Sequence, residues 1–182
     1  MADLKLDYVL MDEVDMDLVL KRIAHEIVER ERNLENLLLI GVLRRGEPLA
    51  HKLAQSLTQS GEVEVPVGTA DVKFYTDDLR LVSQSPIVQE VNLPISIDGK
   101  VVILVDDVLY TGRTLWALMQ RLFEMGNPKA VRICALVDRG HREIPICPDY
   151  VGKTITTTDD QVVKVEVSEI DGHDMVKVMR RV

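Results

Sequence analysis

One stretch, residues 101–115, constrains the fold more than any other part of the chain. It opens with five apolar residues, 101–105, which are typical of a strand buried on both faces of a parallel sheet. Asp106 and Asp107 follow, then a short loop and an amphipathic run over residues 115–125. The pattern predicts strand, acidic pair, turn and helix, and ligands of such sheets gather at the carboxyl ends of strands.

The loop after the acidic pair has the composition of an anion site. We expect backbone N–H groups of residues 109–113 to open towards a helix N-terminus, where Thr111 and Thr114 add hydroxyls. Gly112 would let the backbone approach an anion closely. The two carboxylates would repel a phosphate, but they can accept hydrogen bonds from hydroxyls or hold the waters of a magnesium ion. A ribose 5-phosphate meets both demands, whereas the simpler alternative is a solvated acidic turn.

Composition narrows the class of protein. The 182 residues, 46% of them hydrophobic, suffice for one α/β unit with a sizeable core, and we divide residues 1–182 into no separate domains. The net charge of −8 argues against a general nucleic-acid binder, although it leaves room for a local basic face. Cys134 and Cys147, without a signal-peptide pattern or a membrane-length apolar run, indicate free thiols in a cytoplasmic protein.

Hydrophobic periodicity predicts the other elements. Asp12 is a plausible N-cap for the first helix, and Trp116 is expected to pack on the central helix. The predicted helices cover residues 12–31, 47–57 and 115–125, and the predicted strands cover residues 37–43, 67–75, 101–105, 130–137, 147–152, 162–167 and 175–179. The last two strands are expected to form an antiparallel hairpin.

Two further strand ends carry polar groups. Arg44, Arg45 and Gly46 follow the strand at residues 37–43, and arginines beside a glycine turn can hold an anion through side chain and backbone. Asp138 and Arg139 follow the strand at residues 130–137. A base could pair its edge with backbone groups there, and Arg139 could stack on it or donate to it. Taken alone, each cluster would be better explained as ordinary surface charge.

A long polar stretch follows Phe74 and runs to about Asn92. It contains Tyr75, Asp77 and Asp78 and predicts a loop without regular structure. In a transferase such a loop would exclude water while a reactive cation forms. The alternative is a solvent loop or a long hairpin.

The segment at residues 101–115 resembles the ribose-phosphate motif of type I phosphoribosyltransferases: four apolar residues, two acidic residues and a Thr-Gly-x-Thr loop. Several strings together resemble one branch of these enzymes, the PyrR family of pyrimidine operon regulators that are also uracil phosphoribosyltransferases. These strings are residues 22–27, 75–79, 101–114, 136–143 and 149–153.

This resemblance implies a type I phosphoribosyltransferase fold, an α/β architecture with a mostly parallel sheet flanked by helices, a small hood and a C-terminal antiparallel hairpin. It implies that uracil and phosphoribosyl pyrophosphate (PRPP) give UMP and pyrophosphate, with Mg²⁺ held mainly by substrate phosphates and water. It further implies UMP-dependent binding of a pyrimidine leader mRNA hairpin and a homodimer or higher homo-oligomer. No membrane partner is expected.

Site residues follow from the matching motifs. The resemblance implies catalytic roles for Asp106, Asp107 and Arg45, with Asp106 and Asp107 also facing the metal. The implied substrate-binding residues are Arg44, Gly46, Tyr75, Asp77, Asp78, Tyr110, Thr111, Gly112, Arg113, Thr114, Asp138 and Arg139. The implied RNA-binding residues are Arg22, His25, Arg30 and Lys153.

The chain departs from the family pattern in its loops. Thr76 stands where the family usually has an arginine, and Arg44 and Cys147 replace a usual threonine and arginine. Two alternatives therefore stand beside the bifunctional reading. One is an RNA-binding or nucleotide-sensing regulator with little catalysis, and the other is a purine phosphoribosyltransferase of the same fold.

Overall fold

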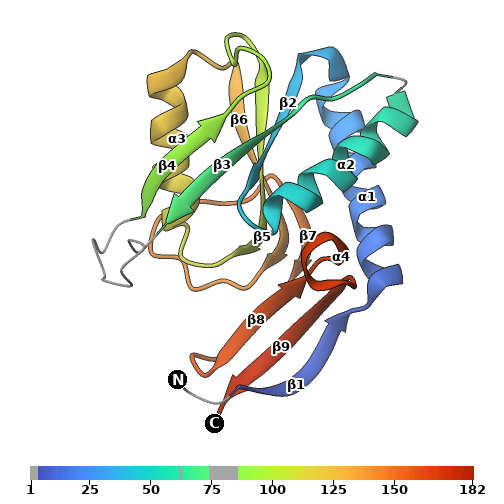
Figure 1. Ribbon diagram of the computed structural model, residues 1–182, viewed down its shortest axis with the longest axis vertical. Helices are drawn as coiled ribbons and strands as arrows, with labels where there is room; N and C mark the ends of the chain where they lie inside the picture. The colour runs from blue at the N-terminus through green and yellow to red at the C-terminus, as the bar shows by residue number, and fades with distance from the viewer. Residues whose placement is uncertain (1–3, 62, 74–85) are drawn as a thin grey trace.

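Two sheets organise the molecule (Figure 1). The computed structural model describes residues 4–61, 63–73 and 86–182. The larger sheet has six strands, in the order β4 (Ile87–Asn92), β3 (Val67–Lys73), β2 (Leu37–Val42), β5 (Val101–Leu109), β6 (Ala130–Asp138) and β7 (Tyr150–Thr154). All neighbours in it are parallel except β3 and β4. Within the described ranges, no helix is long and apolar enough to cross a membrane.

Helices cover both faces of this sheet, because its central strands are apolar on both sides. Leu37 and Leu39 of β2 pack in one core with α1 (Glu13–Glu31) and α2 (Gly46–Gly61). Leu38 and Ile40 point the other way and pack with α3 (Arg113–Met125). The short 3-10 helix η1 (Leu34–Asn36) leads into β2. These elements confirm the predicted α/β architecture.

The start of α1 also agrees with the sequence. Asp12 is the N-cap, and its side chain accepts a hydrogen bond from the backbone N–H of Asp15 at 2.9 Å. Asp15 returns the interaction by accepting from the backbone N–H of Asp12 at 3.2 Å. This reciprocal capping box satisfies two of the helix-terminal donors.

The acidic pair lies within β5 rather than beyond its end, which corrects the expectation from sequence. β5 pairs with β2 only as far as Val105 but continues beside β6 to Leu109. On the β2 side the chain turns into α2 at Gly46, where an added Cβ would lie 2.4 Å from the carbonyl oxygen of Val105. The last residues of β5 therefore have a strand on one side only. The other side, which we call the open edge of β5, pairs with no described strand beyond Val105.

The smaller sheet has three strands, in the order β1 (Leu4–Met11), β9 (Met175–Arg181) and β8 (Gln161–Glu166). We call this sheet, with the short α4 (Ser168–Asp171), the hood. Its antiparallel β8–β9 pair was predicted, but β1 was not. The hood shares its core with α1 and α2 through valines on one face, namely Val163, Val165 and Val176.

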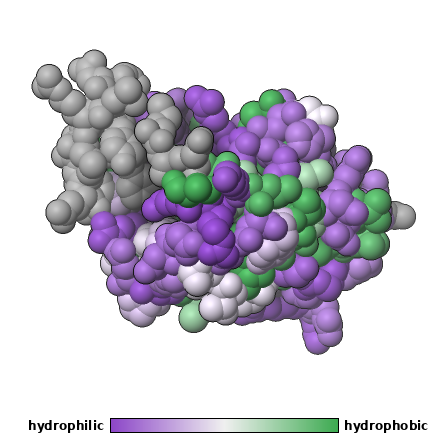
Figure 2. All heavy atoms as spheres, turned by 90° about the horizontal axis from the view of Figure 1, so that it is seen from below, coloured by the Kyte–Doolittle hydropathy of each residue, from purple (hydrophilic) through white to green (hydrophobic). Residues whose placement is uncertain are grey.

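Seen from the hood end, the surface is mostly polar, with apolar side chains gathered in a few patches (Figure 2). β1 contributes exposed apolar residues, namely Leu4, Leu6, Tyr8 and Val9. Trp116 does not pack as expected, because 47% of its surface is exposed on α3.

The predicted long loop after β3 is partly wrong. Ile87–Asn92 forms strand β4, which pairs antiparallel with β3, so this end of the sequence segment belongs to the sheet. Tyr75, Asp77 and Asp78 lie outside the described residues, as does Thr76. The short strand expected at residues 147–152 is displaced and becomes β7. Cys134 and Cys147 are free thiols, as expected.

Candidate functional site

Three neighbouring parallel strands bring most of the predicted substrate residues to one edge of the sheet. β2, β5 and β6 are adjacent, so the segments that follow them meet at the same edge. Leu109, at the end of β5, lies opposite Asp138 at the end of β6. The backbone N–H of Arg139 donates to the carbonyl of Leu109 at 3.1 Å. The β5 and β6 loops therefore form one continuous rim.

The acidic pair is strongly perturbed. Removal from water raises the pKa of Asp106 well above its ordinary value, and the negative charge of Asp107 raises it further. Removal from water also raises the pKa of Asp107, while a hydrogen bond from the backbone N–H of Val108 and the charge of Arg45 counteract this. Each carboxyl is therefore harder to ionise than an isolated aspartate, and a nearby cation would favour the ionised forms.

The phosphate-loop candidate is a turn that leads directly into α3. Gly112 precedes the helix with φ +88°, a left-handed conformation that would strain any other residue, and it has no side chain to cap the first helical amides. The carbonyl of Thr111 accepts hydrogen bonds from the backbone N–H groups of Glu143 at 3.0 Å and Ile144 at 3.3 Å. The loop is thus held from behind, and its helix N-terminus has the polarity that suits an anion.

The two arginines after β2 differ in their surroundings. Arg45 forms a two-point contact with Asp171 of α4: Nε to Oδ2 at 3.1 Å and Nη2 to Oδ1 at 2.8 Å. Arg44 is exposed and, within the described residues, has no hydrogen-bond partner. Gly46 allows the start of α2 to approach β5, so the loop lies beside the open edge of the acidic strand.

At the end of β6, both predicted base-site side chains are engaged within the protein. Asp138 accepts hydrogen bonds from the backbone N–H of Gly140 at 2.9 Å and from Nη2 of Arg142 at 2.7 Å. Arg139 is only 7% exposed and lies 4.2 Å from the ring centroid of Tyr110. A base at this rim would therefore meet a turn whose backbone is fixed by its own side chains.

Arg139 connects the rim to the hood. Its Nε donates to Oγ1 of Thr157 at 3.0 Å, and its Nη2 donates to the carbonyl of Gln161 at the start of β8 at 2.9 Å. Because Tyr110 covers one face of the guanidinium, Arg139 ties the phosphate loop and the hood together. Sequence reasoning had expected this side chain to stack on a base or to donate to it.

Arg142 was not among the predicted site residues, although it lies within the motif at residues 136–143. Its Nη1 donates to the carbonyl of Tyr110 at 2.8 Å, and its Nε donates to the carbonyl of Ile146 at 3.0 Å. Together with the contact to Asp138, these bonds join the β5 loop to the β6 loop. Asp171 was missed as well, because its partner Arg45 is 126 residues away in sequence.

The four predicted RNA-binding residues lie on α1 and the neighbouring β7. Arg22 reaches from α1 to β7, where its Nη2 donates to the carbonyls of Val151 at 2.8 Å and Gly152 at 2.7 Å. Arg22 also pairs with Glu26. Since β7 is the edge strand of the sheet, these bonds tie α1 to that edge.

The other three predicted RNA-binding residues make fewer contacts within the protein than Arg22 does. Arg30 pairs with Asp149 at 2.9 Å, and Lys153 donates to the carbonyl of Leu10 at 3.3 Å. His25 is exposed on α1. Cations and carboxylates therefore alternate on this surface, and its local charge is mixed rather than strongly basic.

Comparison with known proteins agrees with this geometry. The family model described as "Phosphoribosyl transferase domain" matches residues 14–170. A "Bifunctional protein PyrR" from Thermus thermophilus is 46% identical over 172 residues, which cover 94% of this chain and 95% of that protein. A protein of the same name from Deinococcus radiodurans is 50% identical over 159 residues, covering 87% of each chain.

Solved structures agree on the fold. A hypoxanthine phosphoribosyltransferase from Trypanosoma cruzi superposes with a TM-score of 0.78 at 23% identity and covers 96% of each chain. A hypoxanthine-guanine phosphoribosyltransferase from Bacillus anthracis gives a TM-score of 0.73 at 22% identity, covering 98% of this chain and 99% of that one. At these identities, the likeness shows the fold alone and does not indicate which base this chain would use as a substrate.

Proposed function

Because the chain belongs to the PyrR family of phosphoribosyltransferases, we propose that it converts uracil and PRPP into UMP and pyrophosphate. The observation that carries this proposal is the arrangement of residues 106–114. The acidic pair stands at the open edge of β5, and the loop after it leads into the N-terminus of α3. One end of this segment suits a ribose diol and the other suits a phosphate.

Each part of the substrate then has a place. Asp106 and Asp107 accept hydrogen bonds from the ribose hydroxyls, and the loop from Tyr110 to Thr114 receives the 5-phosphate at the start of α3. Arg44, Arg45 and Gly46 lie at the pyrophosphate. The roles of Tyr75, Asp77 and Asp78 remain predictions, since these residues lie outside the described ranges.

Catalysis in this arrangement is mainly electrostatic. The bond between ribose C1 and pyrophosphate breaks as C1 bonds to the uracil nitrogen. The electron pair of the broken bond leaves with pyrophosphate, and the proton of that nitrogen is released to water. Arg45 stabilises the charge that develops on the leaving group. The carboxylates of Asp106 and Asp107 favour the positive charge that develops on the ribose. Positioning of the two reactants supplies the rest of the acceleration.

Magnesium fits this donor set. Two neighbouring carboxylates, Asp106 and Asp107, suit an ion that usually takes one or two protein carboxylates and keeps substrate oxygens and waters as its other ligands. The described ranges contain no group of three or more acidic, histidine or cysteine side chains that would form a metal site from protein alone. When bound, the ion would supply positive charge beside the departing pyrophosphate.

Uracil would be read by the backbone of the β6 turn. Asp138 and Arg142 fix this turn, and Arg139 is engaged with the hood, so the carbonyls and amides of the turn supply the pairing edge. The free thiols suit a cytoplasmic enzyme, and we propose that it acts as a homodimer or higher homo-oligomer.

The assay that tests the transferase function measures pyrophosphate release from PRPP with magnesium and each of three bases: uracil, hypoxanthine and guanine. We expect release with uracil only. Asp107→Asn should lower kcat at least about 100-fold, because it removes a carboxylate from the ribose. Turnover with a purine and none with uracil would assign the chain to the purine branch of the fold.

Regulation by RNA is the second proposed function, supported by the family and by the position of Arg22, His25, Arg30 and Lys153 on one side of the molecule. We expect UMP to strengthen retention of a pyrimidine leader hairpin, and His25→Ala or Lys153→Ala to weaken it. Arg22→Ala is a poorer probe, because Arg22 also holds the edge of β7. Equal, weak binding of unrelated RNAs without any effect of UMP would contradict this proposal.

A further inference from the structure

The contact between Arg45 and Asp171 joins the pyrophosphate-loop candidate to the hood. Nε and Nη2 of Arg45 meet the two carboxylate oxygens of Asp171 at 3.1 Å and 2.8 Å. The arginine side chain is 29% exposed and the aspartate side chain 19%. Two parallel hydrogen bonds define the plane of a guanidinium, which a single contact would leave free to rotate.

Asp171 is itself held in place. Its Oδ2 also accepts a hydrogen bond from the backbone N–H of Val167 at 2.9 Å. The hydrogen bond from Arg45 lowers the pKa of Asp171, and the same bond raises the pKa of Arg45. Both groups are therefore charged at neutral pH, and the contact behaves as a fixed ion pair between α4 and the start of α2.

The pair leaves one edge of the guanidinium available. An arginine has five N–H donors in a rigid fork, and Asp171 engages the edge formed by Nε and Nη2. In the part of the chain that the structure describes, Arg45 makes no other side-chain hydrogen bond. Gly46, the residue after Arg45, packs closely against the carbonyl oxygen of Val105, so this loop lies beside the strand that carries the acidic pair.

We propose that Asp171 is a positioning residue for the pyrophosphate end of the substrate. It holds one edge of Arg45 so that the opposite edge, with both Nη1 hydrogens, faces the pyrophosphate oxygens of PRPP. This inference rests on the proposed phosphoribosyltransferase function. Asp171, a residue of the hood, would thus help to bind the departing pyrophosphate. The rest of that site is formed by β2, β5 and α2.

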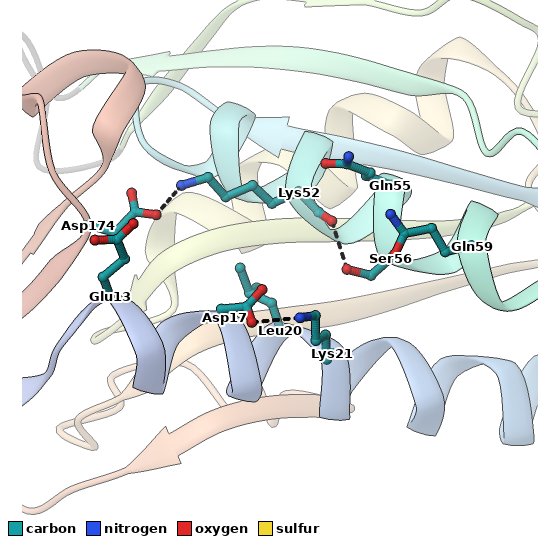
Figure 3. Close-up of a pocket in the computed structure, with 9 residues that line it drawn as sticks. All are labelled: Glu13, Asp17, Leu20, Lys21, Lys52, Gln55, Ser56, Gln59 and Asp174. Atoms are coloured by element: carbon teal, nitrogen blue, oxygen red, sulfur yellow. Dashed lines mark hydrogen bonds and ion pairs between the residues drawn. The ribbon is translucent and has the colours of Figure 1, made fainter.

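A second contact between the same elements provides a matched control. Lys52 of α2 reaches Asp174, in the loop before β9, at 2.5 Å (Figure 3). Lys52 also approaches Ser168 and Glu169 of α4. Asp174 thus ties the hood to α2 without touching Arg45. None of the predicted substrate residues lines the pocket in which Lys52 and Asp174 lie.

The test compares two ligands that share a ribose 5-phosphate and differ in the pyrophosphate. Calorimetric titration with magnesium would give the dissociation constants of PRPP and UMP for the wild type, Asp171→Asn and Asp174→Asn. We expect Asp171→Asn to weaken PRPP binding about 10-fold, roughly the loss of one oriented charge-assisted contact. Its affinity for UMP should stay within about twofold of the wild type. Asp174→Asn should change neither constant by more than that.

Two results would overturn the positioning role. One is an unchanged PRPP affinity in Asp171→Asn, and the other is an equal loss of PRPP and UMP affinity, which would indicate general damage to the hood. The kinetic counterpart is a KM for PRPP that rises in Asp171→Asn while the KM for uracil does not. If the wild type binds PRPP but does not consume uracil, the proposed reaction is contradicted, while the effect of Asp171→Asn on PRPP binding still decides the positioning role.

Discussion

Asp106 is a residue whose surroundings oppose the stability of the folded protein. Its pKa is higher in the folded protein than in an unfolded chain, because removal from water and the charge of Asp107 disfavour ionisation. The ionised form therefore reduces the free energy of unfolding, and this penalty grows as the pH rises through the raised pKa. A ligand that offers hydroxyls or a cation removes the penalty when it binds.

Asp106→Asn should accordingly stabilise the empty protein while impairing it as an enzyme. We expect the free energy of unfolding at pH 7 to rise by about 1 kcal/mol, measured by urea denaturation without ligands. Asp98→Asn is the control of opposite sign, because hydrogen bonds from the backbone of Asn127 and the side chain of Ser96 lower the pKa of Asp98. If Asp106→Asn were less stable than the wild type, the ionised carboxyl of Asp106 would not reduce the free energy of unfolding, and this prediction would be wrong.

At the level of residues, the sequence predicts features whose residues lie close together in the chain. Thr111, Gly112 and the acidic pair follow one another closely in the chain, so the sequence predicted their succession, although the pair lies inside β5 rather than after it. The contact between Arg45 and Asp171 does not, because it joins two loops whose proximity depends on how the hood docks. The engagement of Arg139 with Thr157 is a similar case, since both partners have the character of ordinary polar loop residues in the sequence.

Among the elements, the hood depends on a buried charge. Glu166, at the end of β8, accepts hydrogen bonds from Lys164 at 2.8 Å, from Lys177 at 2.6 Å and from His173 at 2.7 Å. The bonds from Lys164 and Lys177 are the main reasons that its pKa falls to about 2. This cluster links β8, β9 and the turn between them, where backbone pairing alone leaves two lysines directly opposite each other.

Glu166→Gln should therefore weaken the hood in a pH-dependent manner. A folded pKa of about 2, against an ordinary value of 4.5, stabilises the folded state above pH 4.5, and this stabilisation disappears as the pH falls towards 2. We expect a loss of about 2 to 3 kcal/mol at pH 7 in paired denaturation experiments, and a smaller loss at pH 3. The more exposed Glu169→Gln should stay within about 0.5 kcal/mol of the wild type. A loss that does not change with pH would exclude the ion cluster as its cause.

The elements that the sequence predicted well have a pattern of apolar or capping residues within their own segment. β2 and the first five residues of β5 are continuous apolar runs, and α1 has a capping residue and a regular apolar face. β1 and β4 were missed because their side chains are mostly exposed, so neither strand shows the alternation that burial of one face imposes. Both are edge strands, defined by a hydrogen-bonded partner rather than by a core.

For the whole molecule, the hood is joined to the candidate site by the contacts of Arg45 with Asp171 and of Arg139 with Thr157, and β1 is an edge strand of the hood. A chain shortened to begin at Leu10 would keep Met11 in the core but leave β8 and β9 as a two-stranded sheet, which is marginal in water. We expect backbone amides of β9 to exchange with solvent at least about 10-fold faster, while those of β5 keep their protection. Hydrogen-exchange mass spectrometry measures both. Unchanged exchange in β9 would show that the hood stands without β1.

The pairing of β1 with β9 also determines when the site can be completed during synthesis. Asp7 of β1 meets Arg180 of β9 across 173 residues, whereas the strands of the larger sheet lie between these two. A growing chain on the ribosome can therefore assemble the acidic pair and the phosphate loop while β1 still lacks its neighbour. Since α4 and Asp171 emerge just before β9, a nascent chain halted after β7 carries residues 106–114 without the hood residue that contacts Arg45.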